Sequence, residues 1–457
     1  KKMFLTLLFF YSSKIHLHYY FVNLHQKNMN VLLLGSGGRE HALAWKIKQS
    51  PLLTHLFIGP GNAGTSALGT NIDLNPENFE EVATCVANND IEMIVVGPEA
   101  SLVKGIYDFF KNHNKLGNVK VIGPSLRGAR LEGSKDFAKE FMKRHNIPTA
   151  FHTTITSKNL NEGLALLETM PPPFVLKADG LAAGKGVIIT DNLKTAQEKL
   201  IEMICHKAFG AASEKVVIEK FLNGIELSVF VLTDGKNYLI LPEAKDYKKI
   251  GEGDRGPNTG GMGAVSPVAF ANQTFMQKIE QQVIKPTIKG LAKENIDYIG
   301  FIFFGLINEN DNPKVIEYNC RMGDPEAEVV IPRIKNDLLE LFLASANQTL
   351  SNHKIEVDPH AAATIFLASK GYPEQYEKGK TIVLPDIGIG SIIFHAGSRL
   401  SGDTLLTNGG RVMAVTSMAD SLNEALDKSY AIAEKIEFEG KYFRRDIGKD
   451  VLPIKIE

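Results

Sequence analysis

The chain has 457 residues and a formal net charge of −1, with 44% hydrophobic and 23% charged residues. This length is too great for one ordinary core, so two to four domains are expected. A net charge near zero excludes the extended field that gathers nucleic acid or an anionic membrane, and we expect neither as a partner. The three cysteines, Cys85, Cys205 and Cys320, follow no metal-binding spacing and are expected to be reduced thiols.

Residues 1–28 differ from the rest of the chain because they contain no acidic residue, no Gly and no Pro. Their apolar run, residues 3–11, is shorter than the roughly 20 residues that span a bilayer. Neither a small-residue cleavage site nor an Arg-rich pattern follows, as a targeting peptide would require. We therefore expect a leader outside the mature fold, with Met29 as the natural start. A targeting segment is the alternative.

From Met29 onward the pattern predicts an α/β protein. Four short apolar runs are each followed by a Gly-containing turn, and they are Val31–Leu34, Leu56–Ile58, Met93–Val96 and Val119–Ile122. Such units predict a parallel sheet whose ligands bind at the carboxyl ends of the strands. This first domain is expected to cover residues 29–130.

Three further units are expected after it. Residues 131–220 form a small lobe with strands at Phe174–Lys177 and Val216–Glu219. Residues 221–355 form a central lobe that contains a long Gly-rich loop, Gly251–Gly263. Its strands are predicted at Leu227–Leu232, Gly300–Ile307 and Lys314–Cys320. Residues 356–457 form a final domain with strands at Ala363–Ala368, Ser391–His395 and Arg411–Thr416.

The strand at residues 314–320 carries an unusual set of polar side chains. Alternation along a strand would place Glu317, Asn319 and Arg321 on one face, with Ile316, Tyr318 and Cys320 in packing. An acid and an amide suit a hard cation that completes its shell with phosphate oxygens and water. Arg321 could then hold a carboxylate or a phosphate. An edge strand with a solvated polar face is the alternative, and spacing alone does not separate the two.

Three Gly-rich segments are candidates for ligand binding. The loop Lys177–Gly186 would let backbone N–H groups approach phosphates, although Gly186 stands where a P-loop needs Ser or Thr, and a structural hairpin is the alternative. The loop Gly256–Gly263 is too rich in glycine for a simple connector. In the turn Gly35–His41, Glu40 replaces the last glycine of a dinucleotide fingerprint, so a phosphate beside Arg39 is expected in place of NAD.

Taken in order, these segments closely resemble the glycinamide ribonucleotide synthetases, a family of the ATP-grasp superfamily. The resemblance runs from Met29 to near the C-terminus. It is carried by the motifs Gly37–His41, Gly61–Thr65, Val96–Ala100, Leu131–Lys135, Lys177–Gly186, Gly256–Gly263, Glu317–Glu326, His395–Gly397 and Thr407–Val412. It implies an ATP-grasp fold with an N-terminal parallel-sheet (pre-ATP-grasp) domain and a small C-terminal α/β domain.

The resemblance also implies an activity in purine biosynthesis. Glycine and ATP would give a glycyl phosphate, which the amine of 5-phosphoribosylamine attacks to give glycinamide ribonucleotide, ADP and phosphate. ATP would be a co-substrate, Mg²⁺ or Mn²⁺ the metal, and the enzyme a cytoplasmic monomer. The alternatives are another ATP-grasp carboxylate–amine ligase and a nucleotide-binding protein of this fold without turnover.

The family's site residues can be assigned only by motif. Metal binding is assigned to Glu317 and Asn319, and catalysis to Lys177, Arg321 and Asp246. The residues implied to bind ATP are Lys135, Lys177, Gly184, Lys185, Gly186, Glu219, Leu222 and Glu226. The residues implied to bind glycine or phosphoribosylamine are Gly38, Arg39, Glu40, Gly64, Thr65, Pro98, Glu99, Asn258, Thr259, Gly260, Gly261 and Arg321.

One segment departs from the family pattern. Many members read Gln-Asp-His-Lys-Arg before the Gly-rich loop, whereas this chain reads Lys-Asp-Tyr-Lys-Lys at residues 245–249. Asp246 is retained, but the contacts of Lys245 and Tyr247 are not predicted by the resemblance. A change from Arg to Lys also removes the possibility of bidentate hydrogen bonding.

Overall fold

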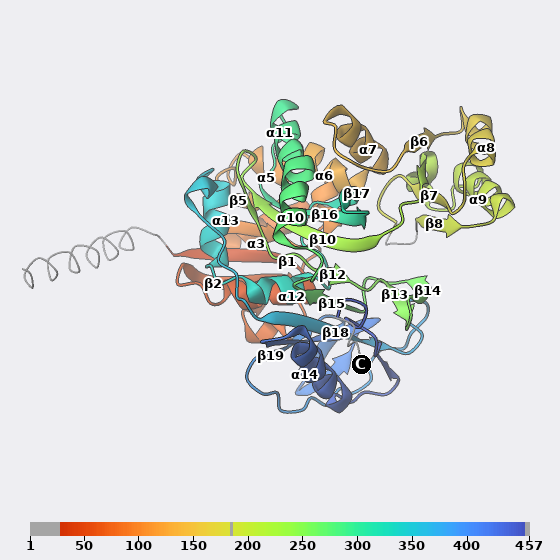
Figure 1. Ribbon diagram of the computed structural model, residues 1–457. Helices are drawn as coiled ribbons and strands as arrows, with labels where there is room; N and C mark the ends of the chain where they lie inside the picture. The colour runs from red at the N-terminus through yellow and green to blue at the C-terminus, as the bar shows by residue number, and fades with distance from the viewer. Residues whose placement is uncertain (1–27, 183–185, 453–457) are drawn as a thin grey trace, which may run out of the picture.

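The computed structural model of the chain describes residues 28–182 and 186–452 (Figure 1). The leader expected at residues 1–28 therefore lies outside the described residues apart from its last position. No helix within the described ranges is both long and apolar enough to cross a membrane.

The N-terminal unit is a parallel sheet with the strand order β3-β2-β1-β4-β5. Residues 31–34 of β1 are fully buried, because helices and neighbouring units cover both faces of the sheet. The four predicted strands are confirmed. The strands are β1 (Met29–Gly35), β2 (Leu53–Pro60), β3 (Thr70–Asn71), β4 (Ile91–Val96) and β5 (Lys120–Ile122). The helices are α2 (Gly38–Ile47), η1 (Thr65–Ala67), α3 (Phe79–Asn88), α4 (Glu99–Val103), α5 (Ile106–Lys111) and α6 (Leu126–Gly133).

The small lobe projects from the rest of the molecule on the right of Figure 1. It is an antiparallel sheet of order β6-β9-β7-β8, and helices α8 and α9 accompany it with a hydrophobic cluster of their own that includes Leu176 and Leu200. The strands are β6 (His152–Ile155), β7 (Phe174–Ala178), β8 (Val187–Thr190) and β9 (Val216–Lys220). The helices of this part of the chain are α7 (Lys135–Arg144), α8 (Leu160–Thr169), α9 (Leu193–Cys205) and η2 (Gly210–Glu214).

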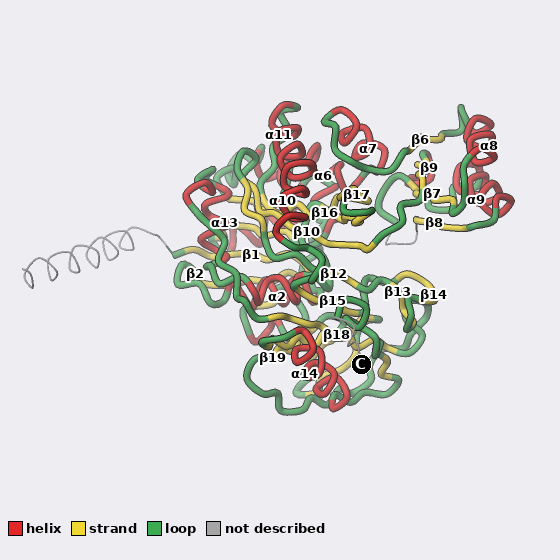
Figure 2. The backbone as a smooth tube through the Cα atoms, in the orientation of Figure 1, coloured by secondary structure: helices red, strands yellow, loops and turns green. Residues whose placement is uncertain are grey.

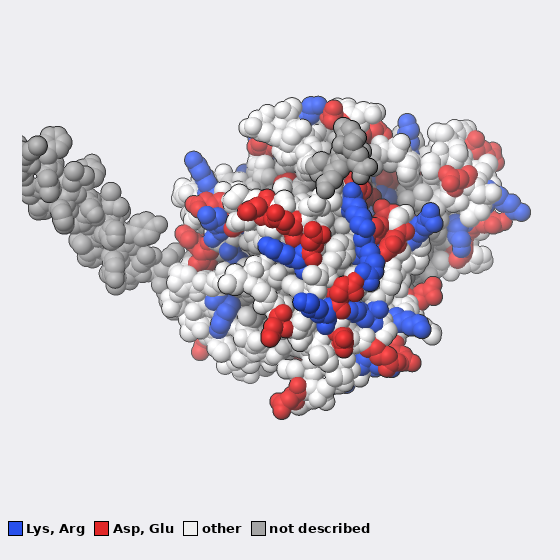
Figure 3. Space-filling view, turned by 60° about the horizontal axis from the view of Figure 1, so that its bottom comes forward, with Lys and Arg blue, Asp and Glu red and all other residues white. Residues whose placement is uncertain are grey.

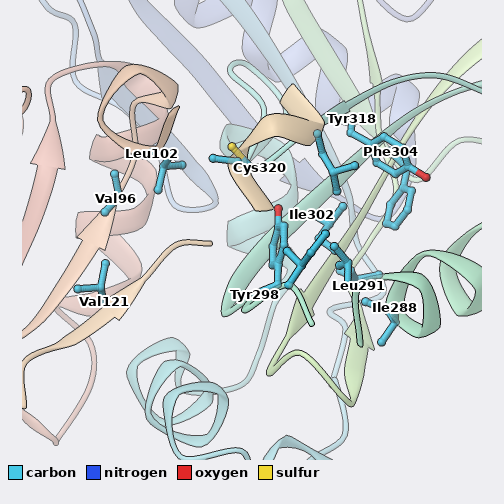
Figure 4. Packing of buried hydrophobic residues seen from close by; sticks show 14 of the residues in the cluster. Val96, Leu102, Val121, Ile288, Leu291, Tyr298, Ile302, Phe304, Tyr318 and Cys320 are labelled. Atoms are coloured by element: carbon cyan, nitrogen blue, oxygen red, sulfur yellow. The ribbon is translucent and has the colours of Figure 1, made fainter. Parts of the chain in front are cut away.

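The central lobe is an antiparallel sheet of order β11-β10-β16-β17. Its core is continuous with that of the N-terminal unit, since Val96 and Val121 belong to the same cluster as Ile302 and Tyr318 (Figure 4). The strands are β10 (Ile225–Thr233), β11 (Tyr238–Ile240), β16 (Gly300–Glu309) and β17 (Asn312–Asn319). The helices are α10 (Gln273–Ile279), η3 (Glu280–Ile284), α11 (Lys285–Lys293), α13 (Leu338–Ala346) and η5 (Leu350–Asn352).

The C-terminal sheet has the order β12-β15-β18-β22-β19, with β23 also pairing with β18. Two of its strands, β12 and β15, come from the middle of the chain and lie between the central sheet and β18 (Figure 2). Helix α14 (Leu422–Lys435) packs on β18 and β22. The strands are β12 (Lys245–Asp246), β15 (Gly263–Ser266), β18 (Ala361–Ser369), β19 (Ser391–His395), β22 (Arg411–Ala419) and β23 (Lys441–Tyr442). Two separate hairpins are β13 (Lys249–Gly251) with β14 (Arg255–Asn258), and β20 (Ser398–Ser401) with β21 (Thr404–Thr407).

A short buried helix, α12 (Ala327–Val330), joins these units and continues into η4 (Ile331–Arg333). It packs against α2 of the N-terminal unit and against β15, β18 and β22 of the C-terminal sheet. On the face drawn in Figure 3, basic and acidic side chains are mixed, in line with the near-zero net charge.

Candidate active site

The end of β17 carries the predicted metal ligands and contains a bulge. Gly305 of β16 pairs with Glu317 and Leu306 pairs with Val315, so Ile316 is the extra residue. Val315, Tyr318 and Cys320 are buried, whereas Ile316 is only half-buried. The prediction that Ile316 packs inward is therefore wrong, because the bulge breaks strict alternation. The packing predicted for Tyr318 and Cys320 is confirmed.

Glu317 lies among positive charges from three different units. Burial alone would raise the pKa of Glu317, but Lys248, Lys177, Lys135 and Arg321 outweigh burial and hold that pKa below its usual value. The carboxylate is therefore ionised in a region able to hold several negative oxygens. Asn319, two residues further on, is buried at the end of the same strand.

Lys177 of β7 enters this region from the small lobe. Its Nζ lies 3.1 Å from Glu219 Oε2 and 3.4 Å from the Ile316 carbonyl oxygen. Lys139 of α7 lies 2.9 Å from the same Glu219 oxygen and donates to Thr149 Oγ1 at 2.8 Å. Burial would raise the pKa of Glu219, yet Lys177 and Lys139 together lower it. Two buried lysines thus share one carboxylate. Sequence reasoning did not single out Lys139, which reads as an ordinary lysine on a helix.

The Leu131–Lys135 motif meets the Gly-rich loop at the start of α7. Lys135 Nζ donates to the Gly180 carbonyl oxygen at 3.4 Å, and Asp179 accepts from the Asp136 N–H at 3.1 Å. Gly186 O accepts from Ala178 N at 2.8 Å, which closes the base of the loop. The implied ATP contacts of Gly184 and Lys185 lie outside the described residues.

The two remaining residues implied to contact adenosine follow β9. Leu222 lies in the connection between β9 and β10, and Glu226 is in β10. Glu226 Oε2 lies 2.8 Å from Lys248 Nζ, with about half of its side chain exposed. Glu226 is therefore accessible beside Glu317 and Lys248, while Glu219 is buried against the two lysines.

Asp246 and Lys248 complete a cluster of alternating charge with Glu226 and Glu317. Burial raises the pKa of Asp246, and the negative charges of Glu226 and Glu317 raise it further. The positive charges of Lys248 and Lys245 lower it, but by less than these effects together. A carboxyl with a raised pKa is the better proton acceptor. Within the described part of the chain, no group of three or more His, Cys, Asp or Glu residues that could hold a metal ion is found.

Arg321 extends the site toward the N-terminal unit. Its Nη2 lies 2.7 Å from Glu132 Oε1 and its Nε lies 3.3 Å from Glu99 Oε2. The Nε is buried and ion-paired with Glu99, without meeting hydrogen-bond geometry there, so Arg321 would have to loosen an acidic partner to bind a ligand carboxylate. Arg39 is near the same acids, with its Nε 2.6 Å from Glu40 Oε1 and its Nη1 bonded to the Met322 carbonyl oxygen.

The second Gly-rich loop is attached to both neighbouring units. Thr259 N donates to Lys248 O at 2.7 Å, and Gly261 N donates to Thr259 Oγ1 at 2.9 Å. Arg411 of β22 donates to the carbonyl oxygen of Gly260 at 2.6 Å and pairs with Asp324 at 2.9 Å. Asn258, at the end of β14, is exposed.

A cavity of about 310 Å³ opens between the N-terminal unit and residues 396–411 of the C-terminal unit. Its lining residues are Ser36, Gly37, Gly61, Asn62, Asp324, Tyr372, Ala396, Gly397, Ser398, Asn408 and Arg411. Several belong to motifs noted in the sequence, but sequence reasoning gave none of them a role. Proximity of residues 36–62 to residues 396–411 depends on tertiary packing, which no local pattern reports.

Other predicted substrate residues support the walls of this region. Thr65 is fully buried, and its hydroxyl bonds with Asn62 and Asn71. A side chain at Gly64 would collide with His41, and one at Gly38 with Glu328, so these glycines permit close packing. Pro98 precedes α4 and places Glu99 at its first turn. None of these predicted residues is among those that line the cavity, and Thr65 acts by stabilising a turn.

The fold and the site together define a class of protein. A structure of the biotin carboxylase domain of Hydrogenobacter thermophilus 2-oxoglutarate carboxylase has 18% identity and a TM-score of 0.69, covers 92% of each chain, and shows a similar fold. The family model for the phosphoribosylglycinamide synthetase ATP-grasp (A) domain matches residues 133–327. The chain is an ATP-grasp ligase, a class that uses ATP and a divalent metal.

The remaining matches specify the family. The N-domain model of phosphoribosylglycinamide synthetase matches residues 29–132, and the C-domain model matches residues 362–450. Phosphoribosylamine–glycine ligase of Chlorobaculum tepidum is 45% identical, covering 93% of this chain and all of the relative. The crystal structure of the Thermotoga maritima phosphoribosylamine–glycine ligase has 38% identity and a TM-score of 0.80, and the match covers 91% of this chain and 99% of that chain. The chain therefore belongs to the phosphoribosylglycinamide synthetase family.

Proposed function

We propose that the chain joins glycine to 5-phosphoribosylamine with ATP, giving glycinamide ribonucleotide, ADP and phosphate. Family membership supports the choice of substrates. The observation that carries the assignment to this site is the convergence of Lys135, Lys177, Lys248 and Arg321 around the ionised Glu317. That arrangement suits a reaction in which phosphate and carboxylate oxygens must be held close together.

The reaction has two steps. A carboxylate oxygen of glycine attacks the γ-phosphorus of ATP, and the bond from that phosphorus to the β–γ bridging oxygen breaks to release ADP. The amine of phosphoribosylamine then attacks the glycyl carbonyl carbon, and the C–O bond to phosphate breaks. Asp246, whose pKa is raised by burial, would accept the proton that the amine loses. No protein nucleophile is required, because positioning and charge stabilisation supply the catalysis.

ATP would lie between the small and central lobes. Lys135 and Lys177 enter from the small-lobe side and would neutralise phosphate oxygens, with the loop at residues 179–186 above them. Glu219 and Leu222 would flank the adenine, and the accessible Glu226 would meet the ribose hydroxyls. Lys177 is bonded to Glu219 in the structure, so a phosphate would compete with Glu219 for its ammonium.

The donor set fits Mg²⁺, with Mn²⁺ as a replacement. Glu317 and Asn319 offer a carboxylate and an amide oxygen at one strand end, the ligand types that a hard cation prefers. When bound, the metal would neutralise charge on the phosphates. Glu317 is held ionised by its cationic neighbours, so it is ready to bind.

Glycine and phosphoribosylamine would occupy the side toward the N-terminal unit. Arg321 would hold the glycine carboxylate in exchange for one of its present partners, Glu99 or Glu132, with the loop at residues 258–261 beside it. The ribosyl phosphate would enter the cavity at Gly37, Asn62 and Arg411. The predicted residues of that side are Gly38, Arg39, Glu40, Gly64, Thr65, Pro98 and Glu99, with Thr65 acting through the turn that it stabilises. We also propose that the enzyme is a monomer located in the cytoplasm.

A coupled ADP-release assay with single carboxylates tests the assignment. Turnover should require ATP, glycine and freshly generated phosphoribosylamine together, and mass spectrometry should identify the amide product. ADP release that ignores glycine and follows another acid would assign a different carboxylate–amine ligase. The absence of turnover with bound ATP would support a nucleotide-binding protein.

A further inference from the structure

The strand and turn at residues 245–248 have two distinct faces. Asp246 and Lys248 lie toward the reaction centre, where their charges act on Glu317 and where Lys248 Nζ lies 2.8 Å from Glu226. Lys245 and Tyr247 are only 7% and 3% exposed and point to the opposite side, as alternation along an extended segment requires. The positions of Asp246 and Lys248 therefore depend on the contacts that hold Lys245 and Tyr247.

One carboxylate holds both of these residues. Lys245 Nζ lies 2.8 Å from Asp450 Oδ2, and the Tyr247 hydroxyl donates to Asp450 Oδ1 at 2.5 Å. The Lys245 ammonium also lies 3.9 Å from the centre of the Tyr247 ring. Burial would raise the pKa of Asp450, but the bonds from Lys245 and Tyr247 lower it, so the carboxylate is ionised.

The residues before Asp450 continue this attachment along the β13–β14 hairpin. Tyr442 OH donates to Ile250 O at 2.8 Å, and Arg444 Nη1 donates to Lys249 O at 3.0 Å. Gly253 N donates to Asp446 Oδ2 at 2.7 Å. Arg444 is 1% exposed and also pairs with Asp254 at 2.8 Å. The hairpin is thus fastened at several points to residues 442–450, which we call the strap.

The same contacts account for two of the three departures from the family pattern, Lys245 and Tyr247. Lys245 and Tyr247 do not enter the reaction centre. Both residues bind Asp450, whose carboxylate pairs with the buried Lys245 ammonium and accepts a hydrogen bond from the buried Tyr247 hydroxyl. A buried ammonium left without its partner carries a large penalty, so the three residues depend on one another.

We propose that the strap, through Asp450, positions Asp246 and Lys248 for the step in which the amine attacks the glycyl phosphate. The inference rests on the proposed role of Asp246. Loss of Asp450 would leave Lys245 buried with an unpaired charge, and the segment would shift to expose it. Glycine and phosphoribosylamine would then bind in a misplaced site. ATP would be affected less, because Lys135 and Lys177 approach from the small lobe and only the Lys248–Glu226 pair links the segment to the proposed ribose site.

Asp450→Asn is the principal test, with Asp427→Asn as the matched control. Asp427 is exposed on α14, so the control makes the same chemical change away from the strap. We expect Asp450→Asn to lower kcat, because a misplaced Asp246 serves the amine-attack step less well. It should also raise KM for glycine and phosphoribosylamine about tenfold, the effect of weakening one charge-assisted hydrogen bond, with KM for ATP within about twofold of wild type. Tyr247→Phe removes only the hydroxyl bond and should give a smaller shift in the same direction.

Two further measurements separate positioning from general destabilisation. Amide hydrogen exchange should accelerate in residues 245–262 of Asp450→Asn and stay unchanged in the small lobe. Adding Lys245→Met to Asp450→Asn removes the unpaired ammonium, while the introduced amide can still accept a hydrogen bond from the Tyr247 hydroxyl. The double variant should therefore recover part of the lost glycine affinity.

Wild-type kinetics and exchange in Asp450→Asn would overturn the proposal. So would equal changes in all three KM values, or a fall in kcat alone that follows a lowered thermal midpoint. Asp246→Asn tests the underlying function separately. If that variant turns over normally, the role of Asp246 fails, whereas the exchange measurement still decides whether Asp450 holds the segment.

Discussion

At the scale of single residues, the site is built from buried charges that share partners. Glu219 is 3% exposed and accepts from both Lys139 and Lys177 through one oxygen, while its other oxygen has no hydrogen bond among the described residues. Burial lowers the pKa of Lys139 to about 8, despite the opposing charge of Glu219. Lys139 is therefore the partner that can stay with Glu219 when ATP claims Lys177.

Lys139→Met should raise KM for ATP about tenfold and leave KM for glycine unchanged. Glu219 would keep Lys177 as its sole counterion, and separating them for a phosphate would cost roughly one charge-assisted hydrogen bond, about 1.5–3 kcal/mol. Steady-state kinetics with varied ATP provide the measurement. Lys143→Met, an exposed position on the same helix, is the control. Equal effects from the two variants would remove the role given to Lys139.

Glu317→Gln should reduce amide formation at least about 100-fold, because the change removes the negative ligand of the metal while keeping its size. Higher Mg²⁺ should restore little of the activity. Glu309→Gln is a suitable control, since Glu309 pairs with Lys314 at the far end of the same strand pair. The coupled ADP assay decides the matter, and near-normal turnover at ordinary Mg²⁺ would exclude Glu317 as a ligand.

At the scale of elements, the bulge in β17 decides where Glu317 points. Gly305 lies opposite Glu317, and a Cβ at Gly305 would stand 3.0 Å from Glu317 Cγ. Gly305→Ala should displace the carboxylate and raise the Mg²⁺ concentration for half-maximal activity several-fold, with little change in KM for glycine. A magnesium titration measures this. Gly388→Ala, where no atom lies within 4 Å of the new methyl group, should behave as wild type.

The sequence predicted the strands better than it predicted how they assemble. Buried runs such as Val31–Leu34 are continuous and apolar because both faces of their sheet are covered. Such strands can therefore be predicted from the local sequence alone. The pairing of β15 with β18 joins segments about 100 residues apart, and nothing local encodes it. The site shows the same division. Glu317 and Arg321 carry a visible spacing, whereas Lys139 and Asp450 gain their roles only from distant partners.

At the scale of the whole molecule, α12 joins the units through buried acids. Glu326, just before α12, is 3% exposed and accepts from Ser228 of β10 at 3.0 Å. Glu328 is fully buried against the start of α2, and neither of its carboxylate oxygens has a hydrogen bond among the described residues. Burial raises the pKa of both acids, to about 8 for Glu326, with the charge of Asp246 adding to its rise. The centre of the molecule is therefore packed around carboxyl groups whose charged form is disfavoured by burial.

Glu326→Gln should change how stability depends on pH. The folded wild type keeps the Glu326 proton up to about pH 8, whereas the unfolded chain releases it near 4.5. Between these values the folded state binds more protons, so this group's contribution is present below pH 4.5 and is lost as pH rises, by up to about 1.4 kcal/mol per pH unit. Glutamine has no proton to release. The urea midpoint of the variant should therefore rise relative to wild type between pH 5.5 and 8.

Glu309→Gln provides the comparison for this pH experiment. The bond from Lys314 lowers the pKa of Glu309, so that carboxyl is ionised across the whole interval and its loss should add no slope. Other groups titrate equally in wild type and variant, and their effects cancel in the difference between the two urea midpoints. A difference that stays constant from pH 5.5 to 8 would mean that Glu326 is already ionised at the centre of the fold. The junction between the units would then be held by charge pairing and not by a neutral acid.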